Sequence, residues 1–375
     1  MVNYICEKCG RSFKQKSHYN MHLKRKTPCV QINKLNEIIE NKITEKLNEI
    51  VIPNKDSKLN VLDLFCGCGG MTTGLQNSGL NIIAGIDIWD TAINSYKKNN
   101  DHLAICEDLT KLPPEKFESE YKLKDTKIDI IVGGPPCQGF SIAGKRDKKD
   151  PRNSLFMEFY KYITYFKPKA FLMENVIGIL SMKTSKNESV IDIIMEKLNE
   201  NYNCNISKLL ACEFEVPQLR KRTIIIGIRK DLEKIPTSPT PILNKNNYIP
   251  VKTIIEPKEN VDKKHFLSER AINGIKAKKE KMKDKKFGFG AQFLNLEKPS
   301  YTIPARYWKD GYDALVKYND DEIRRLNITE LKRIQTFSDE FILDGSNRDK
   351  IIQIGNAVAS RFAYHLGKHL INILK

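Results

Sequence analysis

The spacing of apolar residues changes character at about residue 59 of the chain. Before that point, residues 30–52 place isoleucines and leucines three or four positions apart, which is one face of a helix. Pro53 and a polar stretch then mark a boundary. We interpret residues 31–58 as a helical linker that packs on the next domain. A helix for self-association is the alternative, although the run is too short to indicate a coiled coil.

From residue 59 to residue 228, apolar runs of strand length alternate with glycine-rich turns and helical patterns. The run NVLDLF predicts a strand, a helix follows to about Gly79, IIAGID predicts the next strand, and a second helix ends near Asn100. This repetition is typical of an α/β fold with a doubly wound, mostly parallel sheet and helices on both faces. Such a sheet binds its ligand at the carboxyl ends of the strands.

Between residues 229 and 322 this rhythm stops, and we expect a second, smaller domain there. Residues 236–260 are rich in Pro, Asn and Lys, and residues 258–286 contain 11 Lys and Arg against five acids. A lysine run of this kind is usually a solvated helix face. After it, RRLNITELKRIQTF predicts a helix with Arg325 and Glu330 near its start.

The composition favours a polyanionic partner. The 375 residues carry 63 Lys and Arg against 46 Asp and Glu, a formal charge of +17, and such an excess is typical of proteins that bind nucleic acid. Residues 1–30 hold seven of these cations and one acid, so they and residues 258–286 each contribute +6. The length allows two or three domains with a buried core, which excludes disorder of the whole chain.

Membrane and secreted classes do not fit the sequence. No apolar run approaches the ~18 residues of a membrane helix, and the first residues contain no apolar stretch that would serve as a signal peptide. The nine cysteines are an odd number at low density, which disfavours a disulfide scaffold. We expect a cytoplasmic protein with reduced cysteines, associated with the nucleoid if its source is bacterial.

The first thirty residues form a separate unit with the residue types of a metal site. A C-x2-C pair is followed by a histidine and a further cysteine. A segment this short cannot bury enough apolar surface to fold alone, so a tetrahedral zinc ion with thiolate and imidazole ligands would supply the missing stability. Phe13 and Tyr19 would form its small core. The expected ligands are Cys6, Cys9, His22 and Cys29.

This spacing resembles a zinc finger of the strand–strand–helix type with cysteine as fourth ligand, over about residues 4–29. In such a finger, Gln15, His18 and Met21 would fall at the positions that face bases in the major groove. One finger covers only about three base pairs, and many isolated fingers bind proteins instead. The alternative is a disordered basic tail with chance cysteines.

A glycine-rich turn follows the first predicted strand of the α/β domain. Gly67, Gly69 and Gly70 allow a ligand close to the backbone at a helix N-terminus, and Asp87 ends the second strand, where it is placed to accept from ribose hydroxyls. NAD, FAD and adenosylmethionine proteins share this pattern, so it does not choose between them. The Lys-Ser/Thr of a phosphate-binding P-loop is absent.

Two later strands each bring a reactive group to the same edge of the sheet. Residues 128–141, IDIIVGGPPCQGFS, predict a strand that ends in a rigid loop presenting Cys137. No second cysteine nearby in the sequence makes a redox pair, so this thiol is a candidate nucleophile. Residues 170–176, AFLMENV, predict a strand that carries Glu174. A thiol and a carboxyl group there can attack a ring carbon and protonate the ring.

The chain from about Val61 to its C-terminus resembles a DNA (cytosine-5)-methyltransferase. The resemblance implies a doubly wound adenosylmethionine-dependent methyltransferase sheet over residues 59–228, a smaller target-recognition domain over residues 229–322, and residues 323–375 that support this domain and return to the catalytic one. The implied reaction moves a methyl group from S-adenosylmethionine to carbon 5 of a cytosine in a specific duplex DNA sequence. The motifs occur in the family's order: DLFCGCGGMTTGL, GIDIWDTAINSY, GGPPCQGFS, ENV, QLRKR, RRLNITELKRIQTFSDEF and QIGNAVA.

The resemblance also implies a mechanism. Cys137 would add to carbon 6 of cytosine and load electron density onto carbon 5, while Glu174 would hydrogen-bond ring nitrogen 3 and the exocyclic amine. Arg220 and Arg222 would lie beside the flipped base and its phosphate, with Arg220 at the carbonyl oxygen. Because the attack is perpendicular to the ring, the base must leave the stack. The loop that closes over DNA in this family contributes two further site residues, Gln138 and Ser141.

For the cofactor, the resemblance assigns the ribose to Asp87, packing on the adenine to Ile88 and the adenine amine to Asp108. The family more often has Glu at position 87, and Asp is one methylene shorter but should still reach. The alternative for the glycines and Leu155 is that they are ordinary turn and core residues. The rest of the expected cofactor pocket consists of Phe65, Gly67, Gly69, Gly70, Leu75, Leu109, Pro135, Leu155, Asn356 and Val358.

In the predicted recognition domain, KPSYTIPARY contains the family's Thr-Ile element, so Thr302 and Ile303 would support the flipped base. The lysine-rich residues 258–286 would meet phosphates, which add affinity and little sequence information. Base-reading side chains are expected near residues 287–312. The candidates are Arg306, Tyr307, Trp308 and Lys309.

Two other functions are compatible with parts of the sequence. One branch of the family methylates tRNA, but the chain lacks that branch's Cys-Phe-Thr element in the recognition region. The other is a catalytically silent protein that binds DNA through its finger. Five intact residues argue against it: Cys137, Glu174, Gln218, Arg220 and Arg222. We expect a monomer that acts on double-stranded DNA and has no membrane partner. A cognate restriction endonuclease is the further partner that the resemblance raises.

Overall fold

The computed structural model describes residues 4–6, 12–24, 59–136, 155–184, 187–281 and 291–375. The chain divides into two compact units, residues 1–54 and 55–375. The helical linker predicted over residues 31–58 lies outside the described residues. Among the described helices, none combines the length and the apolar character needed to cross a membrane.

The first unit contains two short antiparallel strands followed by a helix. The ring of Phe13 lies on the helix, with its centroid 6.0 Å from that of Tyr19 and 4.9 Å from that of His22. The side chains of Cys6 and His22 are buried. The order strand, strand, helix is thus the one expected from the sequence. The elements are β1 (Tyr4–Ile5), β2 (Ser12–Phe13) and α1 (Lys16–Leu23).

The second unit is built on a seven-stranded sheet with the strand order β5-β4-β3-β6-β7-β9-β8. The first five strands of this order are parallel, and β9 is antiparallel to both of its neighbours. The mostly parallel sheet predicted from the sequence is confirmed. Because the strand order reverses at β3, a ligand is expected where β3 and β6 end. The strands are β3 (Asn60–Leu64), β4 (Asn81–Asp87), β5 (Leu103–Cys106), β6 (Ile130–Gly133), β7 (Ala170–Val176), β8 (Tyr202–Leu210) and β9 (Lys221–Arg229).

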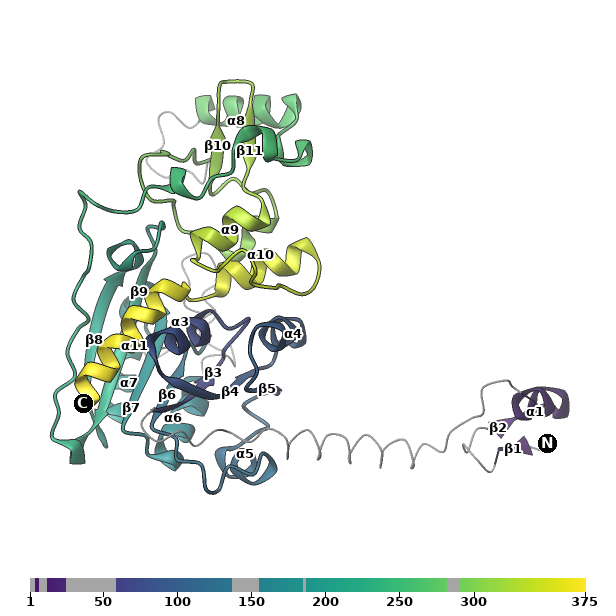
Figure 1. Cartoon of the computed structure of the whole chain (residues 1–375), viewed down its shortest axis with the longest axis vertical. Coiled ribbons are helices and arrows are strands. Elements are labelled where there is room, and N and C mark those ends of the chain that lie inside the picture. The colour runs from purple at the N-terminus through teal and green to yellow at the C-terminus, as the bar shows by residue number, and fades with distance from the viewer. Residues whose placement is uncertain (1–3, 7–11, 25–58, 137–154, 185–186, 282–290) are drawn as a thin grey trace. The chain divides into compact units, whose positions relative to one another are not determined.

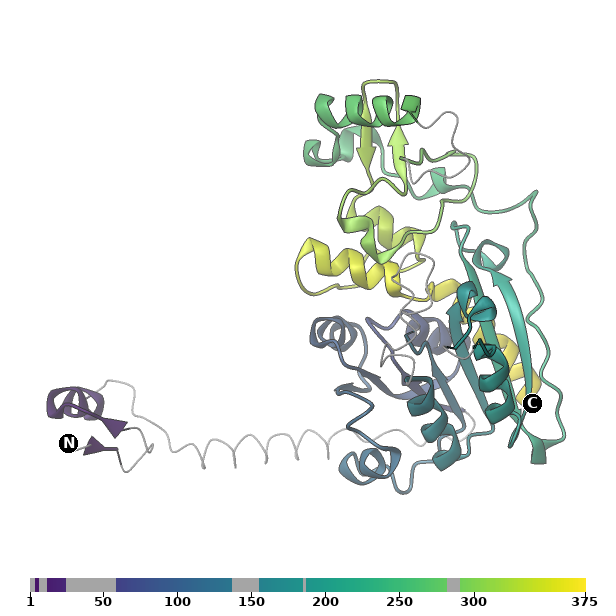
Figure 2. The same cartoon turned by 180° about the vertical axis from the view of Figure 1, so that it is seen from behind.

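Helices cover both faces of this sheet, as Figures 1 and 2 show from opposite sides. On one face, Ile82 of β4 packs in the core with α3 and α11, and Gly85 of β4 lies under Tyr96 of α4, which also contacts α3. On the other face, Phe159 of α6 packs against Gly133 of β6 and Phe171 of β7. The helices are α3 (Gly70–Ser78), α4 (Asp90–Asn99), α5 (Pro114–Glu120), α6 (Leu155–Phe166), α7 (Val190–Leu198) and α11 (Ser360–Leu374).

The C-terminal helix α11 lies directly on α3, the helix that follows the first strand of the sheet. A Cβ atom on Gly74 would overlap the carbonyl oxygen of Ser360, and one on Gly367 would overlap the side chain of Ser78. Glycine at both positions therefore permits the close contact of the two helices. This contact brings the last part of the chain beside the turn that follows β3.

Residues 251–343 form a small lobe, which lies above the sheet in Figure 1. The hairpin of β10 and β11 packs on α8, where Ile272 and Ile275 contact Leu315 and Ile323. Helices α9 and α10 lie between this hairpin and the sheet in the same view. The elements are α8 (Glu269–Lys281), β10 (Leu315–Lys317), β11 (Ile323–Arg325), α9 (Ile328–Ile334) and α10 (Asn347–Asn356).

The described residues of the second unit also contain short 3-10 helices. They are η3 (Ile177–Ser181), η4 (Ala211–Phe214), η5 (Lys230–Leu232), η6 (Val251–Thr253), η7 (Lys258–Asn260), η8 (Lys263–His265) and η9 (Ala305–Trp308).

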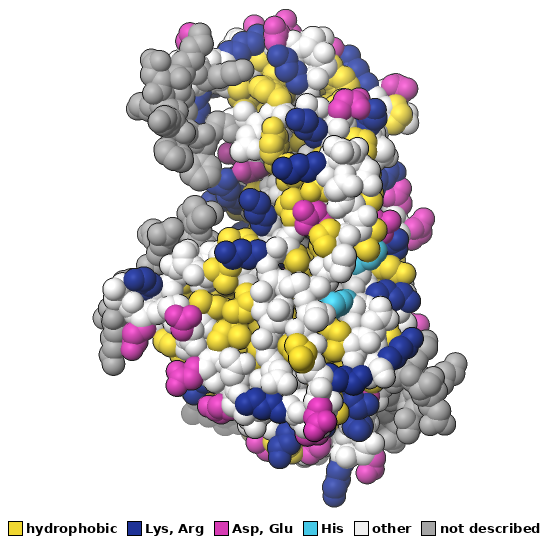
Figure 3. Space-filling model, turned by 90° about the vertical axis from the view of Figure 1, so that its left-hand side faces the viewer, with side chains coloured by type: hydrophobic (Ala, Val, Ile, Leu, Met, Phe, Trp, Pro, Cys, Tyr) yellow, Lys and Arg dark blue, Asp and Glu magenta, His cyan; other side chains and the backbone are white. Residues whose placement is uncertain are grey.

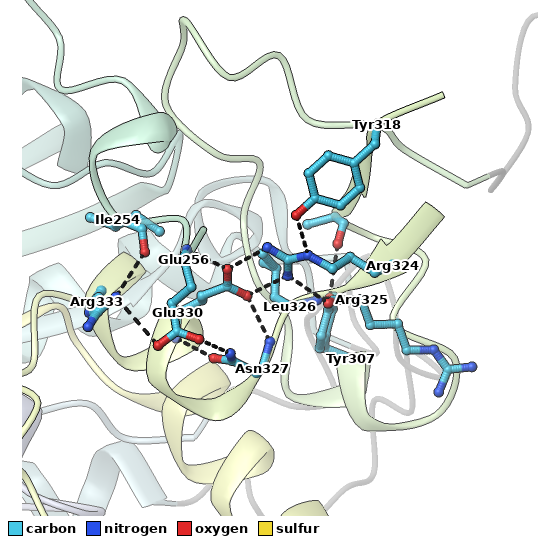
Figure 4. Close-up of polar contacts among 11 residues, drawn as sticks. Ile254, Glu256, Tyr307, Tyr318, Arg324, Arg325, Leu326, Asn327, Glu330 and Arg333 are labelled. Atoms are coloured by element: carbon cyan, nitrogen blue, oxygen red, sulfur yellow. Dashed lines mark hydrogen bonds and ion pairs between the residues drawn. The ribbon is translucent and has the colours of Figure 1, made fainter. Parts of the chain in front are cut away.

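A buried ion pair connects β11 to α9 (Figure 4). Arg324 donates two hydrogen bonds to Glu330, of 2.8 and 2.7 Å, and both side chains have no exposed surface. Burial alone would lower the pKa of Arg324, but hydrogen bonds to Glu330 and Tyr318 raise that pKa above its ordinary value. Glu330 also accepts from the backbone N–H groups of Glu256 and Asn327. One carboxylate therefore holds three segments of the small lobe together.

Candidate active site

The turn after β3 has a backbone that opens toward solvent. Phe65, Gly67 and Gly69 all have positive φ angles, of 60°, 56° and 96°. This conformation is uncommon for a residue such as Phe, and strained residues of this kind concentrate at binding sites. A Cβ atom on Gly67 would meet no atom of the described residues within 4 Å, so these residues leave the space in front of this glycine open. The backbone of the turn is thus available to a ligand.

Asp87, at the end of β4, fixes this turn. Its carboxylate accepts a hydrogen bond of 2.9 Å from the N–H of Gly67 and another of 2.9 Å from the N–H of Trp89. Burial raises the pKa of Asp87, and these hydrogen bonds oppose the increase. A carboxylate has about four acceptor sites, so capacity remains for a hydroxyl donor. Next to it, the side chain of Ile88 is 67% exposed.

The neighbouring strand β5 adds a second carboxylate. Asp108 is half-buried, and its Oδ1 accepts from both the N–H and the hydroxyl of Thr110, at 3.0 and 2.8 Å. Leu109 beside it is buried. Two carboxylates, which accept hydrogen bonds, and one exposed apolar side chain thus lie at the ends of adjacent strands. The assignment of Asp87, Ile88 and Asp108 to an adenosine group stays a prediction.

Residues from the C-terminal part of the chain complete this region. A Cβ atom on Gly70 would overlap the carbonyl oxygen of Val358, so the turn and the segment before α11 are in direct contact. Cys68 packs in the core of the small lobe with Phe337 and Ile354, and burial raises the pKa of its thiol to about 12. Of the other residues expected in the pocket, Leu75 and Pro135 are buried, Leu155 begins α6, and Asn356 is exposed.

A hydrogen-bonded chain under the turn was not predicted from the sequence. Thr72 donates to Asp63 at 2.6 Å, its hydroxyl lies 3.0 Å from that of Tyr96, and the Tyr96 hydroxyl lies 2.6 Å from Nε2 of His102. Burial raises the pKa of Asp63 to about 7 and lowers that of His102 to about 4. The sequence does contain a signal for this chain of hydrogen bonds, because Asp63 lies inside the apolar run NVLDLF. A buried acid of this kind needs a partner.

Replacing Asp63 should change how stability depends on pH. Between pH about 4 and 7 the carboxyl is protonated in the folded chain and ionised in the unfolded one, so its contribution to stability is lost as the pH rises. His102 acts in the opposite direction between about 4 and 6.5. Asp63→Asn should therefore become more stable relative to wild type as the pH increases from 4 to 7, by at most about 1.4 kcal/mol per unit.

The measurement is urea unfolding of wild type and Asp63→Asn across this pH range. His102→Gln, at the other end of the chain of hydrogen bonds, is the matched variant. His102→Gln should lose stability relative to wild type as the pH rises from 4 to 6.5, because it removes the opposite contribution. Parallel curves for wild type and Asp63→Asn would show that Asp63 does not titrate differently in the folded chain.

At the ends of β7 and β9, a carboxylate and an arginine face each other. Nε of Arg222 lies 2.6 Å from Oε1 of Glu174, and both side chains are only slightly exposed, 11% and 13%. Because β9 is antiparallel to β7, its first residues lie at the edge where the parallel strands end. A Cβ atom on Gly134 would come within 3.2 Å of Oε2 of Glu174, so the carboxylate lies against the chain that follows β6.

The other arginine of this segment, Arg220, is placed differently from the expectation. Its terminal nitrogens donate to three main-chain carbonyls, those of Ile303 at 3.3 Å, Gly355 at 2.9 Å and Ala357 at 3.2 Å. The side chain is 3% exposed, and this burial lowers the pKa of Arg220. Arg220 was expected at the carbonyl oxygen of a flipped base, but its terminal nitrogens are taken by backbone, and Arg222 is the arginine beside Glu174.

The Thr-Ile element lies against the same segment. The hydroxyl of Thr302 donates to the carbonyl of Leu219 at 2.7 Å, and Ile303 is fully buried. Of the candidates for reading bases, Tyr307 is also buried, and its hydroxyl donates to Ala314, so it is a core residue and not a base reader.

The remaining candidates, on η9 and just after it, present polar groups at the surface. Arg306 is exposed and forms an ion pair of 2.7 Å with Asp313. Trp308 lies under two cations, with the guanidinium of Arg348 4.6 Å and the ammonium of Lys309 5.8 Å from its ring centroid. Their role as base readers stays a prediction.

The other expected site residues lie partly in the described part of the first unit and partly outside the described ranges. In the first unit, Gln15 and His18 are exposed on or next to α1. Within the described ranges, no three His, Cys, Asp or Glu side chains come together as a metal site requires. The residues outside the described ranges are Cys9, Cys29, Cys137, Gln138 and Ser141.

Comparison with known proteins shows the family of the chain. Residues 59–372 match the family described as C-5 cytosine-specific DNA methylase. Type II methyltransferase M1.HphI of Haemophilus parahaemolyticus is 31% identical over 330 residues, which cover 84% of this chain and 87% of the relative. Type II methyltransferase M.DdeI of Desulfomicrobium norvegicum is 44% identical over 192 residues, which cover 49% of this chain and 45% of the relative.

A solved structure shares the fold of the second unit. The structure of Entamoeba histolytica methyltransferase EhMeth superposes with a TM-score of 0.66 at 19% identity, over 85% of this chain and all of that one. At this identity the likeness concerns the fold alone.

Proposed function

Because the chain belongs to the C-5 cytosine-specific DNA methylase family and is a DNA cytosine methyltransferase, we propose that it methylates a flipped cytosine in a specific duplex sequence through a covalent bond to Cys137. The supporting observation is the pair of Glu174 and Arg222 at the sheet edge, set against Gly134. Cys137 follows Gly134 by three residues in the sequence, so the chain that leads to the nucleophile begins beside this pair.

In the proposed reaction, the thiolate of Cys137 adds to carbon 6 of cytosine. The addition places negative charge on the ring. Glu174 acts as the acid, donates its proton to ring nitrogen 3 and accepts a hydrogen bond from the exocyclic amine, which stabilises that charge. The guanidinium of Arg222 contacts Glu174 and holds its side chain in place. Because Arg222 is the arginine beside Glu174, we assign Arg222, in place of Arg220, to the carbonyl oxygen of the base. Once carbon 5 carries the methyl group, its proton is lost to solvent. The electrons of that bond re-form the double bond between carbons 5 and 6 and expel Cys137 as a thiolate.

S-adenosylmethionine, when bound, supplies the methyl group on a positively charged sulfur. We assign its ribose to Asp87, its adenine to Ile88 and Asp108, and its methionine part to the open turn at Gly67. The space that the described residues leave open before Gly67 and the exposed side chain of Ile88 support this assignment. The further pocket residues are Phe65, Gly69, Gly70, Leu75, Leu109, Pro135, Leu155, Asn356 and Val358.

We assign the reading of the DNA target to the small lobe. Its surface candidates are Arg306 and Lys309 on and next to η9, with Thr302 beside the base pocket. Several lysines of the basic stretch are already paired with acids, as Lys258 is with Glu322 and Lys276 with Asp321. On the face that Figure 3 shows, Lys and Arg side chains are mixed with Asp and Glu. Acids of the lobe therefore neutralise part of the positive charge that the basic stretch would offer to phosphates.

A cognate restriction endonuclease is the partner that we propose for this enzyme. The support is that the relatives M1.HphI, M.SsoII and M.Sau96I are all named Type II methyltransferases. We also propose that the first unit binds one zinc ion through Cys6, Cys9, His22 and Cys29. The order of β1, β2 and α1 and the burial of Cys6 and His22 support this proposal.

Purified full-length protein should contain about one zinc ion per chain, because a thiolate and imidazole set of this kind binds zinc tightly. Cys6→Ser should lose the metal, whereas Cys204→Ser, which changes a half-buried cysteine of β8, should keep it. Elemental analysis by mass spectrometry after gel filtration gives the ratio. Equal zinc content in the two variants, or none in wild type, would contradict the proposal.

Bisulfite sequencing of DNA from cells that express the protein tests the proposed function. We expect protected cytosines at one short recurring sequence, since the enzyme must recognise its target to act on a single base within it. Unprotected DNA, together with methyl incorporation into tRNA by the purified protein, would assign the enzyme to another substrate.

A further inference from the structure

We propose that Arg220 is a positioning residue that couples DNA binding to cofactor binding. This inference rests on the proposed function, because it concerns the cofactor and the DNA of the same reaction. Arg220, Gln218 and Gln335 together form a buried cluster, called the junction here, with exposures of 3%, 0% and 0%. The junction lies between the sheet, the Thr-Ile element and the segment that leads into α11.

Gln218 connects the sheet to the Thr-Ile element. Its side-chain oxygen accepts from the N–H of Ile303 at 3.0 Å, and its nitrogen donates to the side chain of Gln335 at 3.0 Å. The backbone reinforces this contact, since the N–H of Leu219 donates to Ser300 at 2.7 Å. Any movement of the Thr-Ile element must therefore displace groups of the junction that have no access to water.

Arg220 and Gln335 connect the junction to the segment that ends α10. Arg220 donates to the carbonyls of Ile303, Gly355 and Ala357, so one guanidinium links both segments. Gln335 donates to the carbonyls of Ile354 and Ala357, at 2.8 and 3.1 Å. The planar guanidinium donates to several carbonyls in fixed directions at the same time. The ammonium group of a lysine does not have this geometry.

The same segment touches the cofactor turn. The carbonyl of Val358, one residue after Ala357, lies so close to Gly70 that a Cβ atom there would overlap it. On the other side, Gly355 packs against the backbone of Ala305. A continuous path of contacts thus runs from the Thr-Ile element through Arg220 to the turn that we assign to S-adenosylmethionine.

The path predicts a coupling between the two ligands. When DNA fixes the Thr-Ile element, the junction transmits the constraint to residues 354–357 and the turn, so each ligand should increase the affinity for the other. Linkage makes this effect reciprocal, and couplings of about 5- to 150-fold are typical. Arg222 is not part of this path, because its partner is Glu174.

The test compares Arg220→Met with Arg222→Met, and uses Lys221→Met as a control at the exposed position between them. The Kd of S-adenosylhomocysteine, an unreactive product, is measured by calorimetry with and without duplex DNA. In wild type, DNA should tighten this Kd at least about fivefold. Arg220→Met should reduce that factor toward one and raise KM for S-adenosylmethionine about tenfold, while Lys221→Met should leave both unchanged.

Arg222→Met should instead lower kcat and keep the coupling. If Arg220→Met keeps the coupling and loses kcat as Arg222→Met does, Arg220 acts on the base and the proposal is wrong. Absence of coupling in wild type also contradicts it. Gln335→Met removes the donors to Ile354 and Ala357 of the same segment, and it gives an independent test should Arg220→Met fail to fold. Turnover of wild type in the same assay reports separately on the proposed function.

Discussion

Cys137→Ala is expected to transfer no methyl group to DNA above background. Carbon 5 of cytosine is a poor nucleophile, and the bond from Cys137 to carbon 6 is what gives it electron density in the proposed mechanism. Alanine cannot form that bond, and the remaining hydrogen bonds from Glu174 and Arg222 cannot replace it. We expect a loss of at least three orders of magnitude in rate, which corresponds to about 4 kcal/mol in the activation free energy.

The measurement is incorporation of labelled methyl groups into duplex DNA, with DNA affinity determined in parallel. Cys137→Ala should bind DNA like wild type, because the side chain contributes to the reaction and not to phosphate contacts. Cys204→Ala, a cysteine on β8, is the matched control and should retain turnover. Turnover by Cys137→Ala near the wild-type rate would show that Cys137 is not the nucleophile.

Glu330→Gln should produce the largest loss of stability. The substitution keeps the shape of the side chain but leaves Arg324 as a buried charge with no counterion, in a pair that has no exposed surface. Breaking a buried pair in this way typically destabilises a protein by about 3–5 kcal/mol. Glu330 also accepts from the backbone of Glu256 and Asn327, so the small lobe should loosen along with β11 and α9.

Urea unfolding followed by circular dichroism measures this loss. Two variants sharpen it: Asp339→Asn removes an exposed partner of Arg333 and should have a far smaller effect, because water screens that pair. Arg324→Met combined with Glu330→Leu removes both charges and should be less destabilising than Glu330→Gln alone. Equal stability of Glu330→Gln and wild type would show that the pair carries no net free energy.

Local patterns predicted the sheet well, since each of its parallel strands is a short apolar run bounded by turns. They did not predict which side chains of QLRKR face the pocket. Arg220 is drawn away by the carbonyls of Gly355 and Ala357, which lie 135 and 137 residues later in the chain. No spacing within a motif contains that information, because it depends on the return of the C-terminal helix onto α3.

The same limit explains one correction in the small lobe and the partial neutralisation of its basic stretch. Tyr307 was a candidate base reader by its place in the sequence, yet its hydroxyl joins Ala314 to Leu326 in the core. That the lysine-rich stretch meets phosphates stays a prediction, although Lys258 and Lys276 pair with acids from the turn between β10 and β11. Charge counts along the sequence overstate the free charge of a surface when a distant turn supplies counterions.

The most direct test of the central claim uses duplex DNA that carries 5-fluorocytosine at the target base identified by bisulfite sequencing. Fluorine at carbon 5 cannot leave as a proton does, so the elimination that frees Cys137 is blocked and the covalent adduct accumulates. With S-adenosylmethionine present, we predict a complex that resists denaturant and a DNA-modified peptide containing Cys137. Efficient methylation of ordinary DNA with no such adduct, or an adduct on another residue, would contradict the account.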